Sequence, residues 1–199
     1  MIGIIDYGMG NVGSVESMIN YLGYHNTKIV TSPEELREVD KIILPGVGTF
    51  DNGIKNLKVS GLFDELHTQV LINNKPVLGI CLGMQLLMDS SEEGKLSGLG
   101  WIKGVCKKFM FSDRSFKVPH MGWNETFPVT NELCEIDSRF YFVHSYYVEC
   151  DEKDDIMLKT NYGVDFVSGV SKGNIFGVQF HPEKSHRYGM SLMKKFIKL

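Results

Sequence analysis

The first half of the chain alternates short apolar runs with segments of helical periodicity, and this alternation restricts the fold more than any other feature. The apolar runs cover residues 2–5, 27–31, 41–44 and 76–80. Between the first two runs, apolar side chains recur at helical spacing, and Gly23 marks the end of that helix. Strands that alternate with helices need crossover connections, so this half predicts a mainly parallel sheet with helices on both faces.

Two connections in this half carry signals of their own. Ser32 and Glu35 stand three positions apart with a proline directly after the serine, which is the pattern of a capping box at the start of a helix. The pair Pro45-Gly46 is expected to end the third strand. A helix is expected to begin near Leu82, directly after the fourth strand.

The second half of the chain has a different pattern. Residues 101–109, 139–150 and 175–180 are strand-like and are separated by glycine or polar turns, and residues 185–199 are predicted to form a final helix. No repeat, low-complexity tract or flexible linker interrupts the chain. We therefore predict a single α/β domain over residues 1–199, with a mainly parallel central sheet flanked by helices and antiparallel strands in the second half.

Composition and charge argue against several classes of protein. Apolar residues make up 43% and charged residues 23%, and the net charge is −3, so nothing points to nucleic acid or an acidic membrane surface as a partner. No apolar run approaches the roughly 20 residues that span a bilayer. The N-terminal residues lack the basic and long apolar segments of a signal peptide. We expect a cytoplasmic protein without a nucleic-acid or membrane partner.

The four cysteines show no pattern of a metal site or a disulfide framework. There is no C-x-x-C pair and no zinc spacing with the six histidines, so neither a metal nor a cofactor is predicted. We expect reduced thiols, as is usual in a cytoplasmic protein. Cys106, Cys134 and Cys150 are interpreted as packing residues, and Cys81 stands apart because of its surroundings.

The strongest local signal for chemistry is Gly79-Ile80-Cys81-Leu82-Gly83, at the end of the fourth apolar run. It has the form G-x-nucleophile-x-G, a tight strand-to-helix turn that pushes the middle side chain out above the sheet. The start of a helix favours a thiolate over a thiol. The N–H of Leu82 is placed to donate to an oxyanion. The alternative interpretation is a small buried thiol packed between two glycines.

A cysteine nucleophile needs a base, and the best candidate lies in Phe180-His181-Pro182-Glu183. His181 and Glu183 are at positions i and i+2, so they share a face in extended backbone. The carboxylate can then accept from one imidazole nitrogen while the other nitrogen meets the sulfur. Pro182 stiffens this spacing. The alternative is an ordinary His-Pro-Glu turn on the surface. The cysteine turn described above favours the catalytic interpretation over this alternative.

The third element is Pro45-Gly46-Val47-Gly48, after the third apolar run. Glycines let backbone N–H groups approach a ligand closely. At the end of a neighbouring parallel strand, the N–H of Val47 or Gly48 can supply a second oxyanion donor. Taken alone, the segment also fits an ordinary strand-to-helix turn.

A competing motif lies near the N-terminus, where residues 8–13 match the G-x-G-x-x-G spacing of dinucleotide-binding proteins. The acid expected at the end of the second strand is missing, because Val30-Thr31-Ser32 stands there. We interpret these glycines as permitting a tight loop at the same edge of the sheet.

The histidines other than His181 lack a carboxylate or metal partner by spacing. His25 and His67 are expected on the surface, in contact with solvent. A structural or positioning role is predicted for His120, His144 and His186.

The segments around Cys81 and His181 resemble the class I, or triad, glutamine amidotransferases. The resemblance is carried by Gly79-Ile80-Cys81-Leu82-Gly83-Met84-Gln85 and by Gln179-Phe180-His181-Pro182-Glu183-Lys184-Ser185. Other similar segments follow along the whole chain: Ile5-Asp6-Tyr7-Gly8-Met9-Gly10-Asn11, Leu44-Pro45-Gly46-Val47-Gly48, Pro119-His120-Met121-Gly122-Trp123-Asn124 and Tyr141-Phe142-Val143-His144-Ser145-Tyr146. Two of these six segments, residues 5–11 and 119–124, are similar to the glutaminase subunits of imidazole glycerol phosphate synthase.

The resemblance implies that Cys81, His181 and Glu183 hydrolyse L-glutamine to glutamate and ammonia through a thioester. It implies that backbone N–H groups near Val47 or Gly48 and of Leu82 hold the oxyanion. By their positions in the family motifs, the residues that would bind glutamine are Gly48, Gln85, Ser145 and Tyr146. Gln85 follows Cys81 by four positions, which is one helical turn.

The resemblance also implies a heterodimer with a (β/α)₈ cyclase subunit, which uses the ammonia in histidine biosynthesis. The residues that would face this partner are Asn11, Pro119, Met121, Gly122, Trp123 and Lys184. Two positions depart from the usual family pattern: Gly13 replaces a basic residue, and Lys195 replaces an asparagine. Two alternatives therefore stay open, an ammonia-supplying subunit for a sugar amidotransferase of surface-polysaccharide synthesis and a stand-alone cysteine hydrolase.

Overall fold

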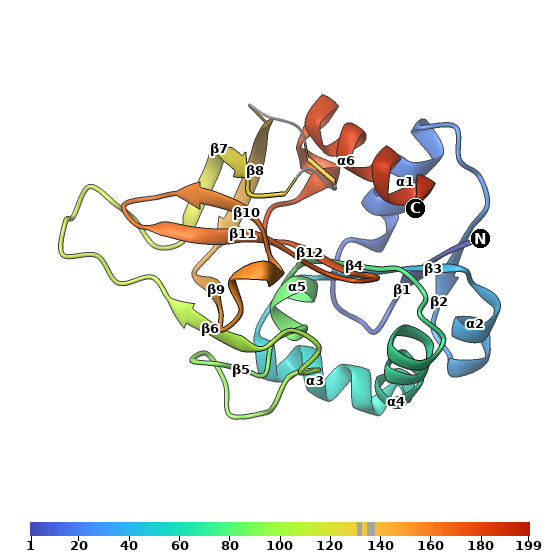
Figure 1. The fold of residues 1–199 in the computed structure, drawn as a ribbon. Coiled ribbons are helices and arrows are strands. Elements are labelled where there is room, and N and C mark those ends of the chain that lie inside the picture. Colours follow the sequence, from blue (N-terminus) through green and yellow to red (C-terminus); the bar gives the residue numbers. More distant parts are fainter. Residues whose placement is uncertain (131–132, 135–137) are drawn as a thin grey trace.

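Five parallel strands form the centre of the sheet in the computed structural model, which describes residues 1–130, 133–134 and 138–199 (Figure 1). Their order is β2 (Thr27–Val30), β1 (Ile2–Ile5), β3 (Lys41–Gly46), β4 (Val77–Cys81) and β12 (Ile175–Val178). Every neighbouring pair in this set is parallel. The predicted parallel sheet is therefore confirmed.

The predicted end of the third strand is wrong. Pro45 and Gly46 remain in β3 and pair with Ile80 and Cys81 of β4. The pairing of β3 with β1 stops at Ile43, so the missing N–H of the proline costs no contact with β1. This extension carries the strand to the level of Cys81.

Antiparallel strands continue the sheet beyond β12, as the second half of the sequence predicted. They follow in the order β11 (Asp165–Lys172), β10 (Ile156–Asn161), β7 (His120–Pro128) and β8 (Ser138–His144). A side branch consists of β9 (Tyr146–Cys150), which pairs with β11 and β6 (Gly104–Lys108), and of β5 (Ser90–Ser91), which pairs with β6. The strand-like segment 139–150 thus divides at Ser145, because its two halves pair with different neighbours.

Helices cover both faces of the parallel strands (Figure 1). One face carries α1 (Val12–Tyr21) and α6 (His186–Lys198). The opposite face carries α2 (Pro33–Glu38), α3 (Phe50–Val59), α4 (Leu62–His67) and α5 (Leu82–Leu86). Alternation along the strands supplies both cores, since Ile4 packs with the first group and Ile5 with the second.

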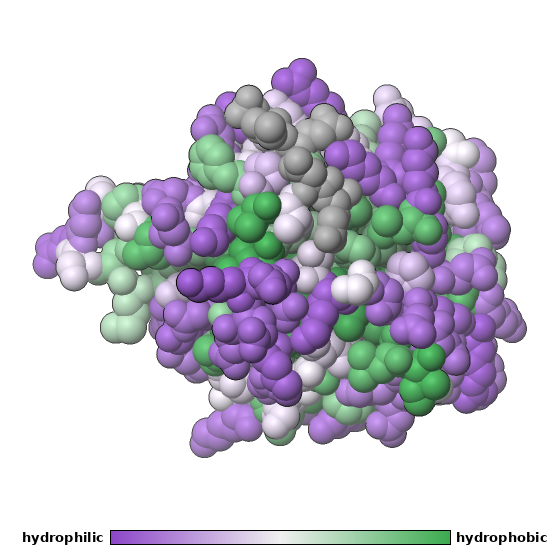
Figure 2. Space-filling view, viewed as in Figure 1, coloured by the Kyte–Doolittle hydropathy of each residue, from purple (hydrophilic) through white to green (hydrophobic). Residues whose placement is uncertain are grey.

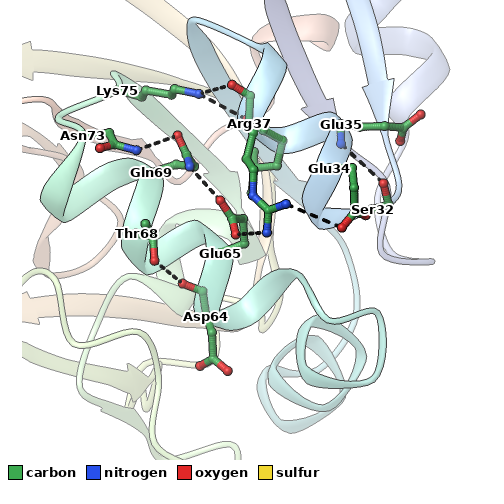
Figure 3. Close-up of polar contacts among 11 residues, drawn as sticks. Ser32, Glu34, Glu35, Arg37, Asp64, Glu65, Thr68, Gln69, Asn73 and Lys75 are labelled. Carbon is green, nitrogen blue, oxygen red and sulfur yellow. Dashed lines mark hydrogen bonds and ion pairs between the residues drawn. The ribbon is translucent and has the colours of Figure 1, made fainter.

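A polar network joins α2 to α4 and to the single π-turn Thr68–Ile72 that follows it (Figure 3). Arg37 donates to Glu65 at 2.9 Å, and Gln69 donates to the same carboxylate at 2.6 Å. At the start of α2, Ser32 accepts from the N–H of Glu35 as the capping pattern predicts. The Glu35 carboxylate accepts from the N–H of Thr31 at 2.8 Å, one residue before the capping serine.

A long connection between β6 and β7 projects from the body of the molecule at the left of Figure 1. Figure 2 shows hydrophilic and hydrophobic residues side by side on this projection. Met110 and Val118 are among its exposed apolar residues. In the described part of the chain, no helix combines the length and the apolar character that crossing a membrane requires.

Candidate active site

Cys81 lies at the end of β4 in a turn that two glycines make possible. Its φ of 55° falls in the left-handed region, which residues other than glycine rarely adopt. A Cβ on Gly83 would lie 1.8 Å from the carbonyl oxygen of Leu44, and a Cβ on Gly79 would lie 2.7 Å from the oxygen of Gly83. Neither position has room for a side chain, which accounts for the glycines on both sides of the cysteine.

The Cys81 side chain lines a cavity of about 330 Å³, a size within the usual range of small-molecule sites. Eight other residues of the predicted site or partner interface line the same cavity: Val47, Gly48, Leu82, Pro119, Gln85, Ser145, Tyr146 and His181. Three further residues line it that the sequence analysis did not place there: Glu93, Val143 and His144. The ends of the parallel strands and the β8–β9 turn therefore form opposite walls of one cavity.

His181 and Glu183 form a buried pair beside this cavity. Nδ1 of His181 lies 2.8 Å from Oε1 of Glu183, and each side chain is only 3% exposed. A carboxylate can only accept, so Nδ1 carries the proton. Nε2 is buried without a hydrogen-bond partner. Burial alone would lower the pKa of His181, but its interactions with Cys81 and Glu183 raise the pKa to about 10.

The backbone at His181 is fixed from two sides. Its N–H donates to the carbonyl of Tyr141 at 2.9 Å, and Ser185 Oγ donates to its carbonyl at 2.6 Å. Ser185 Oγ in turn accepts from the N–H of Tyr141 at 3.0 Å. The backbone of His181 is thus tied to β8 and to the start of α6.

The glycine segment 45–48 lies directly against the cysteine turn. Gly46 pairs with Cys81 in the sheet, and a Cβ on Gly46 would lie 3.0 Å from the N of Gly83 and 2.6 Å from the hydroxyl of Tyr7. Gly48 has φ 116°, a conformation that favours glycine. The segment therefore brings its backbone to the cavity where Cys81 lies.

Two glutamine side chains connect the cysteine to the opposite wall. Nε2 of Gln179 lies 3.8 Å from the Cys81 sulfur, and Oε1 of Gln179 accepts from Nε2 of Gln85 at 3.0 Å. Nε2 of Gln85 also donates to the carbonyl of Tyr146 at 3.1 Å. Both nitrogen-bound protons of Gln85 are therefore engaged, and only its carbonyl oxygen is left for a ligand.

The sequence analysis missed Gln179 and Glu93. Gln179 could have been found, because it precedes His181 by two positions and so continues the period that pairs His181 with Glu183. Glu93 carried no such signal. It reaches the cavity from the connection after β5, where its carboxylate accepts from the N–H of Phe50 at 2.8 Å.

Most of the residues predicted to face a partner are exposed, and one of them, Pro119, also lines the cavity. Met121 and Trp123 are 62% and 42% exposed, so a core role for them is excluded. The Trp123 ring stacks on the exposed ring of His186 at 5.5 Å. Pro119 and Lys184 are also exposed, and Gly122 is half-buried.

A second hollow lies on the other side of the His-Pro-Glu segment. It has a volume of about 660 Å³ and brings together Asn11, Glu183, Lys184 and His186. Asn11 accepts from the N–H of Ser14 and so caps α1. The structure therefore places Asn11 and Lys184 in one groove, next to the side chain that holds His181.

The remaining histidines divide into exposed and buried ones. His25 is exposed, as expected. The prediction for His67 is wrong, because it is half-buried and both of its ring nitrogens face carbonyl oxygens, those of Phe63 and Leu99. His120 and His144 are buried and lie 3.0 Å apart, between Nδ1 and Nε2.

The other cysteines lie away from the cavity. Cys106 and Cys134 are buried, and Cys150 is half-buried. Burial raises the pKa of Cys106 and raises the pKa of Cys150 to about 12. The described residues hold no group of three or more candidate ligands that could bind a metal ion.

Of the glycines at positions 8–13, Gly8 and Gly10 lie in a tight loop and Gly13 lies in α1. Gly8 and Gly10 have φ of 78° and 112°. A Cβ on Gly10 would lie 3.2 Å from the carbonyl carbon of Pro45, so the loop packs on the glycine segment 45–48. A Cβ on Gly13, in contrast, would meet nothing within 4 Å.

Comparison with known proteins agrees with this geometry. The family described as Glutamine amidotransferase class-I matches residues 3–199. The chain belongs to the class I glutamine amidotransferase family.

Individual relatives are similar over the full length. A Methanococcus maripaludis protein named imidazole glycerol phosphate synthase subunit HisH 2 is 55% identical over 100% of this chain and 99% of its own. A protein of the same name from Pseudomonas aeruginosa is 49% identical, and subunit HisH of Leptospira borgpetersenii is 48% identical, each over 100% of both chains.

Solved structures share the fold at low sequence identity. A crystal structure of a glutamine amidotransferase superposes with a TM-score of 0.79 at 17% identity, covering 99% of this chain and 97% of the other. The structure of PurLQS from Thermotoga maritima gives a TM-score of 0.76 at 18% identity, with the same coverage. These neighbours support the fold alone.

Proposed function

We propose that this chain is the glutaminase subunit of an imidazole glycerol phosphate synthase. In this role it hydrolyses L-glutamine to glutamate and ammonia and passes the ammonia to a (β/α)₈ cyclase subunit in histidine biosynthesis. The observation that carries the chemistry is the buried His181–Glu183 pair, whose free Nε2 lies in the same cavity as Cys81. The full-length similarity to proteins named HisH supports the choice of pathway.

The first half of the reaction forms a thioester. Cys81 transfers its proton to Nε2 of His181, and the thiolate attacks the side-chain amide carbon of glutamine. The amide oxygen becomes an oxyanion, held by the N–H of Leu82 and by an N–H of Val47 or Gly48. His181 then gives the proton to the leaving nitrogen, the carbon–nitrogen bond breaks, and ammonia departs.

The second half restores the enzyme. A water molecule gives a proton to Nε2 of His181 and attacks the thioester carbon, forming a second oxyanion at the same donors. The carbon–sulfur bond breaks, the sulfur takes back the proton, and glutamate is released. Glu183 holds Nδ1–H throughout, so the imidazole keeps one tautomer and its charged form is stabilised.

Glutamine recognition follows from the acceptors that line the cavity. We propose that Gly48, Gln85, Ser145 and Tyr146 contact the substrate. Because both protons on Nε2 of Gln85 are engaged, its free Oε1 is suited to accept from the α-ammonium group. Glu93 adds a carboxylate to the same cavity, which suits the same positive charge.

The partner would dock where the cavity opens. Met121 and Trp123 offer exposed apolar area beside it, and Lys184 and Asn11 extend that surface to the neighbouring groove. Such a position lets ammonia leave Cys81 toward the partner rather than into bulk water. A reducing compartment such as the cytoplasm would keep Cys81 as a thiol, and we place the enzyme there on that ground.

The test is glutamate release measured in three reactions: the chain alone, with a histidine-pathway cyclase subunit, and with a polysaccharide-pathway sugar amidotransferase. We expect slow release alone and a large rise with the cyclase when its ligand is present. A rise with the sugar amidotransferase only would move the enzyme to the other pathway. Fast release alone that neither partner changes would indicate a stand-alone hydrolase.

A further inference from the structure

Two buried histidines link strand β7 to the wall of the catalytic cavity, and the reaction described above does not use them. Nδ1 of His120 lies 3.0 Å from Nε2 of His144, and Nδ1 of His144 lies 2.8 Å from the carbonyl oxygen of Tyr146. At the other end, the side-chain nitrogen of Asn124 lies 3.3 Å from Nε2 of His120. A continuous row of contacts therefore reaches from β7 to the β8–β9 turn.

The partners fix the direction of every hydrogen bond in this row. The Tyr146 carbonyl can only accept, so Nδ1 of His144 carries a proton and its Nε2 is the acceptor. His120 must then donate from Nδ1, which leaves its Nε2 to accept from the amide of Asn124. With both imidazoles neutral, each is thereby held in one tautomer.

Burial and ring packing hold this state. His120 and His144 are 2% and 5% exposed. Burial lowers the pKa of His120 to about 4 and is the main cause that lowers the pKa of His144 to about 3. The His120 ring lies between those of Tyr162 and Phe142, with centroids 4.0 Å and 4.8 Å away and nearly parallel planes.

The row continues from Tyr146 to the nucleophile. The Tyr146 carbonyl accepts from His144 on one side and from Gln85 on the other. Gln85 holds the carbonyl oxygen of Gln179, and this orients the Gln179 amide so that its nitrogen donates to the sulfur of Cys81. Gln179 is fully buried.

We propose that His120 and His144 are positioning residues for Cys81, which fix the Tyr146 carbonyl and thereby the Gln85–Gln179 amide pair that donates to the sulfur. The proposal deepens the proposed function, on which it rests for the role of Cys81. It also connects β7 to Cys81 through this row of contacts. On that strand the outward-facing Met121 and Trp123 alternate with the inward-facing His120 and Asn124.

The test is the rate at which iodoacetamide alkylates Cys81, read from the mass of the peptide that contains it. Gln179→Met removes the donor to the sulfur at nearly constant volume and is expected to slow alkylation about tenfold. His144→Leu loosens the donor without removing it, and we expect roughly a threefold loss. His144→Asn keeps a donor close to the Nδ1 position and should restore most of the rate.

The double variant decides whether the two residues act through one path. If His144 acts through Gln179, then His144→Leu with Gln179→Met is no slower than Gln179→Met alone, within about a factor of two. Independent effects would multiply to roughly thirtyfold, and that result would overturn the proposal. If His144→Leu does not fold, the same cycle is run with His120→Leu, one contact further from Cys81.

A matched control separates positioning from general loosening. Thr126 lies on the same strand, is 1% exposed and contacts Thr160 through its hydroxyl at 3.1 Å, and it is not a member of the row of side chains that runs from Asn124 to Gln179. Thr126→Val should lower the melting temperature and leave the alkylation rate unchanged. Equal slowing by Thr126→Val would overturn the proposal. Alkylation needs no glutamine, so it tests the positioning role separately from the proposed function. If the chain without substitutions never releases glutamate, that result contradicts the proposed function and not this positioning role.

Discussion

The two walls of the catalytic cavity are built in different ways. The wall that carries Cys81 is local: the turn after β4 depends on Gly79 and Gly83, within two residues of the nucleophile, and on the neighbouring strand β3. The opposite wall is assembled over long distances in sequence, since Tyr146 accepts from Gln85 and His144 contacts His120 of β7. The comparison suggests that the first wall supplies the chemistry and that the second tunes and positions it.

The largest effect is expected at the nucleophile. Cys81→Ala removes the sulfur that forms the thioester, so glutamate release from glutamine should fall by roughly 10⁴-fold or more. The melting temperature should change little, because alanine occupies the same backbone position. Full activity in this variant would show that Cys81 is not the nucleophile.

A smaller loss of activity is expected from the residue that orients the base. Glu183→Gln keeps the shape but weakens the hold on Nδ1–H of His181, and kcat should fall by roughly 10²- to 10³-fold with little change in KM. Steady-state glutamate release measures both constants. A pure rise in KM would show that Glu183 serves binding instead.

The local wall should be sensitive to a single methyl group. Gly83→Ala places a Cβ against the carbonyl oxygen of Leu44, so the turn or β3 must move. We expect a loss of about 3 kcal/mol in the free energy of unfolding by urea, with reduced activity. An unchanged free energy of unfolding would mean that the close approach of position 83 to Leu44 does not require a glycine.

The parts of the site that the sequence predicts are those formed by residues close together in the chain. The turn at Cys81 and the pair at His181 and Glu183 were predictable, because fixed short spacings encode them. Glu93 was not, since it reaches the cavity through contacts far apart in sequence. The continuation of β3 through Pro45 also depends on where its pairing with β1 ends, which no local pattern records.

The long-range wall should respond to acid. Above about pH 6.5 the imidazoles of His120 and His144 are mostly neutral in both the folded and the unfolded protein. At lower pH they bind protons in the unfolded protein, but in the folded protein their lowered pKa keeps them neutral. The free energy of unfolding should therefore fall as the pH drops from about 6.5 to about 4, by on the order of 6 kcal/mol for the two groups together.

Urea unfolding at a series of pH values checks this acid response, with His144→Asn as the comparison. That variant lacks one of the two groups, so its stability should fall less steeply over the same range. His181 acts in the opposite direction: its raised pKa gives a contribution that is present below about pH 6.5 and is lost as the pH rises through about 10. Equal acid slopes in both proteins would contradict the neutral state inferred for His144.

The smallest effect is expected where a glycine lies outside both walls. Gly13 is in α1, and an added Cβ would meet nothing within 4 Å. Gly13→Ala should therefore stabilise the chain by about 0.5 to 1 kcal/mol and leave glutamate release unchanged. Destabilisation by this variant would show that the glycines of residues 8–13 act together with the glycine segment 45–48.

The most direct test of the central claim is covalent labelling with a glutamine analogue that carries an electrophilic carbon in place of the side-chain amide carbon. After proteolysis, mass spectrometry locates the adduct. The account predicts one adduct, on Cys81, that forms with saturation and is slowed by L-glutamine, and none on Cys106, Cys134 or Cys150. An unlabelled Cys81, or a label on another cysteine that glutamine protects, would contradict it.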